Sequence, residues 1–132
     1  MAGVDLSKHA LRRAAKRQGS IEFAVASVYD LPVADQQIDL LVNCFSPLAL
    51  EEFRRVLRPG GTFCGCFYVS GACRRTDRLI RRAYEPMKFF TPPYETMDSL
   101  RERLNRMYST VQLGNVRSIA WFVCRKGEER NV

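Results

Sequence analysis

Short apolar runs recur along the chain and predict β-strands. The three longest are IEFAVAS (21–27), IDLLVNCF (38–45) and TFCGCFYVS (62–70), each rich in β-branched, aromatic or small residues. The run 38–45 is almost continuously apolar, which is typical of a strand covered on both faces in a parallel sheet. A further strand ends just before Ser7, where two aliphatic residues flank Asp5.

Apolar residues at helical spacing fill the stretches between these strands. Ser7 can cap the first helix, whose apolar side is mostly alanine. Ser46 followed by Pro47 predicts the start of a second helix, which ends at the turn 58–61. An arginine-rich helix comes next, and Thr96 predicts the cap of a last one.

The C-terminal part of the chain predicts a hairpin. YSTVQLG (108–114) and SIAWFVCRK (118–126) are candidate strands joined around Gly114-Asn115. Because strands alternate with helices before them, we expect a parallel sheet with helices on its faces and one antiparallel addition. The aromatic and proline-rich loop 87–96 is expected to be pinned onto the core, and a lid over a flat substrate is the alternative.

The composition is that of a globular domain. With 132 residues, 46% of them hydrophobic and 27% charged, the chain predicts one domain with a modest core. No apolar run approaches the roughly 20 residues that span a bilayer, and the N-terminus lacks the residue order of a secretory signal. We therefore expect a cytoplasmic protein with no membrane contact.

The cysteines and the single histidine limit the chemistry that the chain can carry. Five cysteines are an odd number, no CxxC pair occurs, and Cys64 and Cys66 point to the same face of one predicted strand. His9 is the only histidine and lies on a predicted solvated helix. These patterns predict neither a metal site nor a cysteine–histidine nucleophile, and they leave the catalytic residues unassigned.

A net charge of +7 makes RNA, or another anionic molecule, a candidate partner. One predicted helix presents five arginines on one side, namely Arg74, Arg75, Arg78, Arg81 and Arg82. Such a stripe is more often a solvated face than a nucleic-acid contact, and both interpretations stay open.

An acidic residue at the end of the first predicted strand points to nucleotide binding. In nucleotide-binding α/β folds such an acid accepts hydrogen bonds from ribose hydroxyls, and it follows a glycine-rich turn by roughly 20 residues. Asp5 has only four residues before it. If Asp5 is that acid, the first strand and the turn are absent from this chain. The alternative is that Asp5 only favours the start of the helix.

Three segments resemble, in order and spacing, the core of class I S-adenosylmethionine-dependent methyltransferases. They are GVDLS (3–7), FAVASVYDLPVADQQIDLLV (23–42) and EEFRRVLRPGG (51–61). Residues 3–61 are most similar to the catalytic domain of large-subunit ribosomal RNA guanine-N1 methyltransferases. The resemblance implies an α/β, Rossmann-like sheet, mostly parallel with a C-terminal antiparallel hairpin and N-terminally truncated, in a single partial domain over 1–132. The missing first strand of the family lies between the strand ending at Asp5 and the one ending at Asn43.

The resemblance also implies a binding site for the cofactor, S-adenosyl-L-methionine, at the strand ends. Asp5 matches the acid that holds the ribose hydroxyls, and Leu6 lies beside the adenine. Ser27 stands where the family often has an aspartate that reads the adenine amino group, and Val28 offers its backbone amide to the ring. Asn43 faces the methionine part of the cofactor.

The loop of Phe45, Ser46 and Pro47 matches the segment that borders the methyl acceptor, so it is the implied substrate-binding segment. The implied function is S-adenosylmethionine-dependent methyl transfer to an unidentified acceptor, either an RNA base or a small molecule. Because this transfer is an in-line displacement, it depends on orientation and exclusion of water and needs no metal or triad. Lack of the glycine-rich turn predicts impaired activity, and a non-catalytic interaction module is the alternative.

Overall fold

The computed structural model describes residues 1–87 and 93–128. Helices and strands alternate over the first two thirds of the chain, as the sequence predicts, except that a loop without a helix joins the second and third strands. In chain order the elements are β1 (Ala2–Asp5), α1 (Lys8–Arg17), β2 (Glu22–Val25), β3 (Ile38–Cys44), α2 (Leu50–Val56), β4 (Leu57–Tyr68), α3 (Arg74–Tyr84), the short 3₁₀ helix η1 (Glu85–Met87), α4 (Met97–Met107), β5 (Thr110–Val116) and β6 (Ile119–Arg125).

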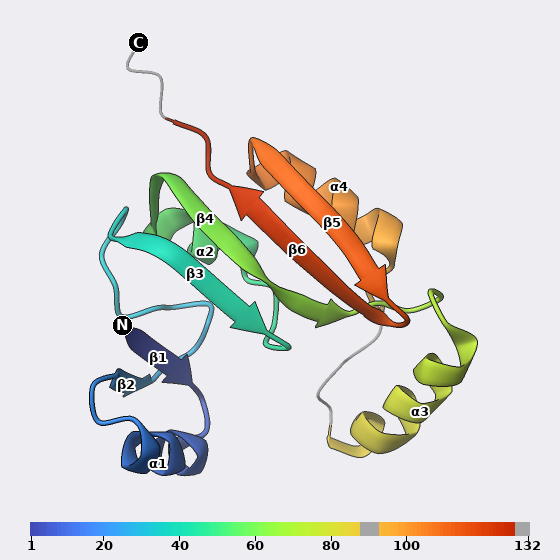
Figure 1. Ribbon diagram of the computed structural model, residues 1–132, viewed down its shortest axis with the longest axis horizontal. Helices are drawn as coiled ribbons and strands as arrows, with labels where there is room; N and C mark the ends of the chain where they lie inside the picture. The colour runs from blue at the N-terminus through green and yellow to red at the C-terminus, as the bar shows by residue number, and fades with distance from the viewer. Residues whose placement is uncertain (88–92, 129–132) are drawn as a thin grey trace.

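The strands form two separate sheets (Figure 1). β1 and β2 pair in parallel, with Asp5 opposite Val25. The other four strands follow the order β3-β4-β6-β5, in which β3 and β4 are parallel and β6 is antiparallel to both of its neighbours. The α/β class and the C-terminal antiparallel hairpin are confirmed. β1 and β3, between which the resemblance places another strand, belong to different sheets.

The core lies on one face of the four-stranded sheet. Phe63 of β4 is fully buried, and its ring centroid lies 5.2 Å from that of Phe53 in α2 and 5.0 Å from that of Phe122 in β6. Leu100 and Leu104 of α4 belong to the same cluster and are also fully buried. α2 and α4 therefore cover the same face of the sheet, and Figure 1 shows both of them behind it.

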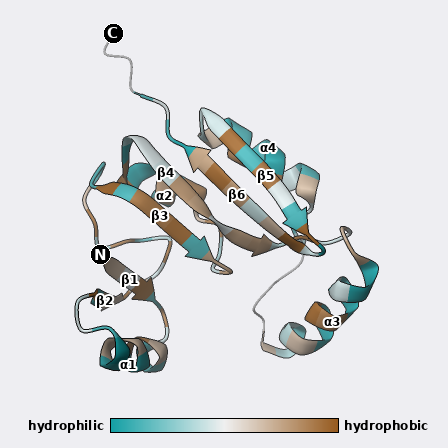
Figure 2. Ribbon diagram, in the orientation of Figure 1, coloured by the Kyte–Doolittle hydropathy of each residue, from teal (hydrophilic) through white to brown (hydrophobic). Residues whose placement is uncertain are grey.

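The other face of this sheet is open, which contradicts the prediction that residues 38–45 are covered on both sides. Leu40 and Val42 point away from α2 and α4 and are 57% and 60% exposed. Figure 2 shows hydrophobic residues along β3 in this view. The apolar pattern does indicate a strand, but it does not tell whether a partner layer is present.

The N-terminal unit of β1, α1 and β2 (residues 2–25) has no comparable core. No residue from 1 to 42 is buried, although Leu11 and Ala14 of α1 are half-buried. Ser7 caps α1 as predicted, because its hydroxyl oxygen accepts a hydrogen bond from the Ala10 amide at 3.2 Å. Contacts between neighbouring segments hold this unit together.

One predicted helix boundary is wrong. α2 begins at Leu50, with Ala49 as its N-cap, and not at Ser46. The Ser46 hydroxyl donates a hydrogen bond to the side chain of Asn43, so it is not available to cap a helix. The predicted turn 58–61 belongs to β4, which begins directly after α2 ends at Val56.

The predicted position of the hairpin turn is also wrong. Val116 pairs with Ile119, so the chain reverses at Arg117, which adopts a φ of 54°, and the residue after it. Gly114 lies within β5 opposite Trp121, and a side chain at Gly114 would overlap the indole ring. Gly114 therefore makes room for an aromatic side chain on the neighbouring strand, which no local turn pattern reveals.

The described part of the loop 87–96 is held against the body of the molecule, as predicted. Tyr94 packs on Tyr68 at the end of β4, with ring centroids 5.9 Å apart and edge-on. The Arg81 guanidinium of α3 lies 4.7 Å from the centre of the Tyr94 ring. Residues 88–92, which include Phe89, Phe90 and Pro92 of the proposed lid, lie outside the described residues.

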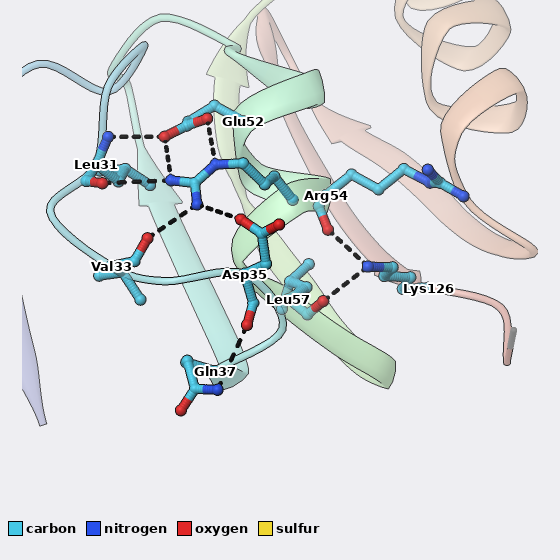
Figure 3. A network of polar contacts seen from close by, with 9 residues as sticks. Leu31, Val33, Asp35, Gln37, Glu52, Arg54, Leu57 and Lys126 are labelled. Carbon is cyan, nitrogen blue, oxygen red and sulfur yellow. Dashed lines mark hydrogen bonds and ion pairs between the residues drawn. The ribbon is translucent and has the colours of Figure 1, made fainter.

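A buried lysine joins the last strand to α2 (Figure 3). Lys126, which is 4% exposed, donates hydrogen bonds from Nζ to the carbonyl oxygens of Arg54 at 2.9 Å and Leu57 at 2.8 Å. These carbonyls lie at the end of α2, where the helix leaves acceptors without intrahelical partners. The ammonium group therefore completes the C-terminus of α2.

Candidate cofactor site

Asp5 lies at the carboxyl end of β1, at the start of α1. Its Oδ1 accepts a hydrogen bond from the Ser7 amide at 2.7 Å, and its carbonyl oxygen accepts one from the Ala26 amide at 3.2 Å. The side chain is exposed, and within residues 1–87 and 93–128 its Oδ2 has no hydrogen-bond partner. One carboxylate oxygen thus orders the helix start, and the other is available to a ligand.

Ser27 and Val28 follow the adjoining end of β2. The Ser27 hydroxyl oxygen accepts a hydrogen bond from the Tyr29 amide at 3.2 Å, and its carbonyl oxygen accepts one from the Asp30 amide at 3.1 Å. These bonds form a tight turn. The Val28 side chain packs against the core cluster, and in the described part of the chain its amide donates no hydrogen bond. Leu6 is 73% exposed.

Asn43 and Ser46 hold the loop after β3 in a fixed shape. The Asn43 side chain is buried, at 4% exposure, and its Nδ2 donates to the Ser46 carbonyl oxygen at 3.1 Å. The Ser46 hydroxyl donates to Oδ1 of Asn43. Between them Phe45 adopts a left-handed φ of 60°, and its amide donates to the Cys66 carbonyl oxygen at 3.1 Å. Both polar atoms of the Asn43 side chain are therefore engaged by the loop that ends at Pro47.

Gly65 allows the backbones of β3 and β4 to approach closely at this point. It pairs with Asn43 across the two strands, and a Cβ at Gly65 would overlap the Asn43 carbonyl. The close approach of the two backbones at this position therefore requires a glycine. Gly65 of β4 thus fixes the position of the end of β3. The Asn43–Ser46 pair fixes the loop that follows β3.

The predicted site residues fall into two groups. Asp5, Leu6, Ser27 and Val28 lie together at the paired ends of β1 and β2, whereas Asn43 and the loop 45–47 lie at the end of β3 in the other sheet. Figure 1 shows the arrows of β1 and β3 pointing the same way. Both groups therefore lie at carboxyl ends of parallel strands, the edge where open α/β sheets bind ligands.

An ionic network that the sequence does not predict holds the loop between β2 and β3 (Figure 3). Arg55 of α2 pairs with Glu52 through Nη2 and Oε1 at 2.6 Å and with Asp35 through Nη1 and Oδ1 at 2.7 Å. Arg55 also donates to the carbonyl of Val33 at 2.9 Å, and Glu52 accepts a hydrogen bond from the Leu31 amide at 2.8 Å.

The contacts of this ionic network determine the charge state of Glu52. The hydrogen bond from Arg55 lowers the pKa of Glu52 to about 2, so the carboxylate stays charged at neutral pH. The network anchors the loop that carries Ser27 and Val28 to α2. The spacing of Glu52 and Arg55, three residues apart on a predicted helix, indicates that these two side chains can pair. It does not indicate their partners in the loop, which are remote in sequence.

A surface hollow of about 700 Å³ lies between the loop after β2, α2 and α4. Its lining residues are Tyr29, Leu48, Ala49, Leu50, Glu51, Glu52, Arg55, Arg103, Arg106 and Met107. None of the predicted cofactor residues lines it. Its arginines pair with acidic residues, as in the pairs of Arg55 with Glu52 and Arg106 with Glu102. The arginines of the hollow are therefore already engaged by carboxylates.

Burial raises the pKa of the Cys64, Cys66 and Cys124 thiols, so these three cysteines are poor nucleophiles. Within residues 1–87 and 93–128, no cluster of three or more histidine, cysteine or acidic side chains could hold a metal ion. In the same residues, no helix is both long and apolar enough to cross a bilayer.

Residues 1–65 match the methyltransferase domain family. The 23S rRNA (guanine(748)-N(1))-methyltransferase of Streptomyces fradiae is 47% identical over 60 residues, which are 45% of this chain and 21% of that protein. The demethylmenaquinone methyltransferase of Chlorobaculum parvum is 32% identical over 91 residues, which are 64% of this chain and 36% of that protein. The chain spans about a fifth of the length of the first of these relatives.

The fold is also that of solved methyltransferases. The crystal structure of a SAM-dependent methyltransferase from Methanosarcina mazei matches 97% of this chain and 82% of that chain, with a TM-score of 0.70 and 16% sequence identity. The likeness includes both sheets of the present structure, since it extends over nearly all of its residues.

Proposed function

We propose that this chain, whose residues 1–65 match the methyltransferase domain family and whose fold is that of solved methyltransferases, forms the adenosine-binding part of an S-adenosylmethionine-dependent enzyme that methylates a base in RNA. The observation that carries the proposal is the arrangement at the paired ends of β1 and β2. There an exposed carboxylate oxygen of Asp5 and the free amide of Val28 lie beside the Ser27 turn. The carboxylate can accept hydrogen bonds from the two hydroxyls of a ribose, and the backbone amide beside it can donate one to an adenine ring.

Each residue has a separate part in binding. Asp5 accepts hydrogen bonds from the ribose hydroxyls through Oδ2, while Oδ1 stays on the Ser7 amide. Leu6, 73% exposed, covers one side of the adenine. The Val28 amide donates to the ring edge, and the Ser27 turn holds that amide in place.

The chemistry that S-adenosylmethionine supplies when bound is an electrophilic methyl group. The chain contributes orientation and exclusion of water. The Asn43–Ser46 pair keeps the loop 45–47 rigid, so that Phe45 and Pro47 form a firm border for the acceptor. Both polar atoms of the Asn43 side chain bond to Ser46, so Asn43 positions the loop.

The net charge of the chain and its similarity to an rRNA methyltransferase favour an RNA base as the methyl acceptor. The chain carries a net charge of +7. Four arginines of α3 have exposed side chains and no ion-pair partner among the described residues, namely Arg74, Arg75, Arg78 and Arg82. Such a surface attracts a phosphate backbone. The relative that is 47% identical over 60 residues is named for methylation of a guanine in 23S rRNA.

Transfer by this chain alone is expected to be weak. Its eight glycines include no GxGxG turn, whose backbone would cradle the methionine end of the cofactor. A non-catalytic module with the same fold is the second candidate function. It is favoured by the open face of the large sheet, where Leu40 and Val42 are exposed.

Isothermal titration calorimetry with S-adenosylhomocysteine tests the proposal. We expect a dissociation constant of about 100 μM for the wild-type chain and at least about tenfold weaker binding for Asp5→Asn. The matched control is Glu22→Gln, an exposed acid at the opposite end of β2, which should bind like the wild type.

The variant Asp5→Asn keeps an oxygen for the Ser7 amide, so it should fold. Equal affinity of Asp5→Asn and wild type would disprove the role of Asp5. No binding at about 5 mM would remove the proposed function, and submicromolar binding would contradict the expectation of weak transfer.

A further inference from the structure

Helix α1 presents a dense set of positive charges. Its 10 residues include no acidic residue and five cationic ones, namely Lys8, Arg12, Arg13, Lys16 and Arg17. Because an α-helix turns about 100° per residue, all five fall on one half of the helix surface. We call this half the basic side of α1.

The charges of the basic side are not neutralised within the molecule. All five side chains belong to exposed residues. Among residues 1–87 and 93–128 none of them takes part in an ion pair, whereas Arg55 of α2 and Arg101 of α4 pair with acids on their own helices. The basic side is therefore available to an external anion.

These charges also repel one another. Lys8, Arg12 and Lys16 follow at intervals of four residues, so each is a neighbour of the next along the helix surface. Lys8 lies in the first turn, where the helix dipole disfavours a cation. The unit of β1, α1 and β2 has no buried residue that would offset this repulsion. A bound polyanion would relieve it.

The opposite side of α1 is occupied by the N-terminal unit itself. Leu11 and Ala14 are half-buried, and the helix contacts β1 and β2. A helix that lies in a membrane surface needs a free apolar side with bulky residues, and α1 has none to offer. The basic side therefore suits a hydrophilic polyanion better than a lipid surface.

We propose that the basic side of α1 binds the phosphate backbone of the substrate RNA. The proposal rests on the proposed function for the identity of the anion. At about 1.5 Å per residue the 10 residues of α1 extend over about 15 Å, the length of about four successive phosphates of one strand. Five cations on one side of the helix match this density of charge.

The position of α1 is compatible with this role. Figure 1 shows α1 and α3 at opposite corners of the same edge of the molecule, with the end of β3 between them. The loop 45–47, which is the proposed border of the methyl acceptor, follows β3 at this edge. An RNA whose target base lies at this loop can thus extend toward α1 on one side and toward α3 on the other.

Fluorescence anisotropy with a labelled single-stranded RNA of about 20 nucleotides tests the proposal, at about 50 to 200 mM KCl. We expect the double variant Arg12→Gln and Lys16→Gln to bind about tenfold or more weakly at the lowest salt. The slope of the logarithm of affinity against the logarithm of salt should become shallower by about 1.4, because each phosphate contact of a single strand contributes about 0.7. Glutamine keeps the helix propensity of these positions, and circular dichroism checks the fold.

The matched control is the double variant Arg101→Gln and Arg106→Gln. Both arginines are exposed on α4 and pair with acids, so the net charge falls by the same amount without any change on α1. This control should bind RNA within about twofold of the wild type, because distant surface charges are screened. Equal losses in the two double variants would overturn the proposal, since only the net charge would then matter. RNA binding that survives the α1 variant unchanged would also overturn it.

Two further measurements separate this inference from its alternatives. Vesicles of phosphatidylserine and phosphatidylcholine should bind the wild type more weakly than RNA does, and equal or tighter binding would contradict the choice of RNA. The α1 variant should bind S-adenosylhomocysteine like the wild type in calorimetry, because Arg12 and Lys16 lie outside the proposed adenosine site. Unchanged RNA binding by that variant would therefore remove this inference alone, whereas a wild-type chain that binds RNA but no S-adenosylhomocysteine would remove the proposed function alone.

Discussion

The two halves of the molecule differ in how much of them is buried. Residues 1–42 carry the proposed adenosine site, yet none of them is buried. From Asn43 to Lys126 the chain contains every buried residue of the described part, including the aromatic cluster around Phe63. Local contacts therefore form the proposed adenosine site, whereas the free energy of unfolding comes mainly from the other part of the chain.

A pair of matched aromatic truncations gives the sharpest test of this comparison. Phe63→Ala should lower the free energy of unfolding by about 3–5 kcal/mol, because it leaves a cavity in the core. Phe23→Ala, in half-buried β2, should cost only about 1 kcal/mol. Urea denaturation followed by circular dichroism measures both, and equal losses would show that the N-terminal unit contributes to the core after all.

Glycine replacement tests the close approach at the end of β3. Gly65→Ala places a methyl group against the Asn43 carbonyl, so β3 and β4 must separate at this point. We expect a loss of about 1–3 kcal/mol in the free energy of unfolding. Gly19→Ala, where a Cβ meets nothing within 4 Å, is the control in the N-terminal unit and should be neutral. A stable Gly65→Ala would mean that Asn43 is not held from β4.

The smallest effect concerns the ionic network between the two halves. Arg55 lowers the pKa of Glu52 from 4.5 to about 2 in the folded chain. Because the folded pKa lies below the unfolded one, the stabilisation is complete above pH 4.5 and is lost as the pH falls toward 2. Glu52→Gln should therefore flatten the decline in unfolding free energy over this range.

Glu51→Gln, an exposed neighbour on the same helix, is the control and should decline like the wild type. Denaturant titrations at several pH values measure the difference. Parallel curves for wild type and Glu52→Gln would show that the network does not anchor the loop.

Local patterns in the sequence predicted the elements well. Apolar runs located the strands, and Ser7 and Thr96 cap their helices as expected, the latter in a reciprocal pair with Ser99. Asp5 has the position at a strand end that its sequence context predicts. In each of these cases the deciding contacts lie within a few residues along the chain.

The features that the sequence did not predict depend on contacts between residues that are distant along the chain. Ser46 is a good helix cap in isolation, but Asn43 takes its hydroxyl, and Gly114 is needed beside Trp121 and not in a turn. Asp35 meets Arg55 only after α2 has docked. The exposure of Val42 could not be predicted either, since an apolar residue in a strand has the same pattern whether or not a second layer covers it.

The buried contact of Lys126 has a consequence for biosynthesis. The helix end that it completes, at residues 54–57, leaves the ribosome about seventy residues before Lys126 does. The central sheet also needs β6 between β4 and β5 before it is whole. Synthesis must therefore pass Lys126 before this region can complete its fold, and until then its hydrophobic strands stay exposed to aggregation.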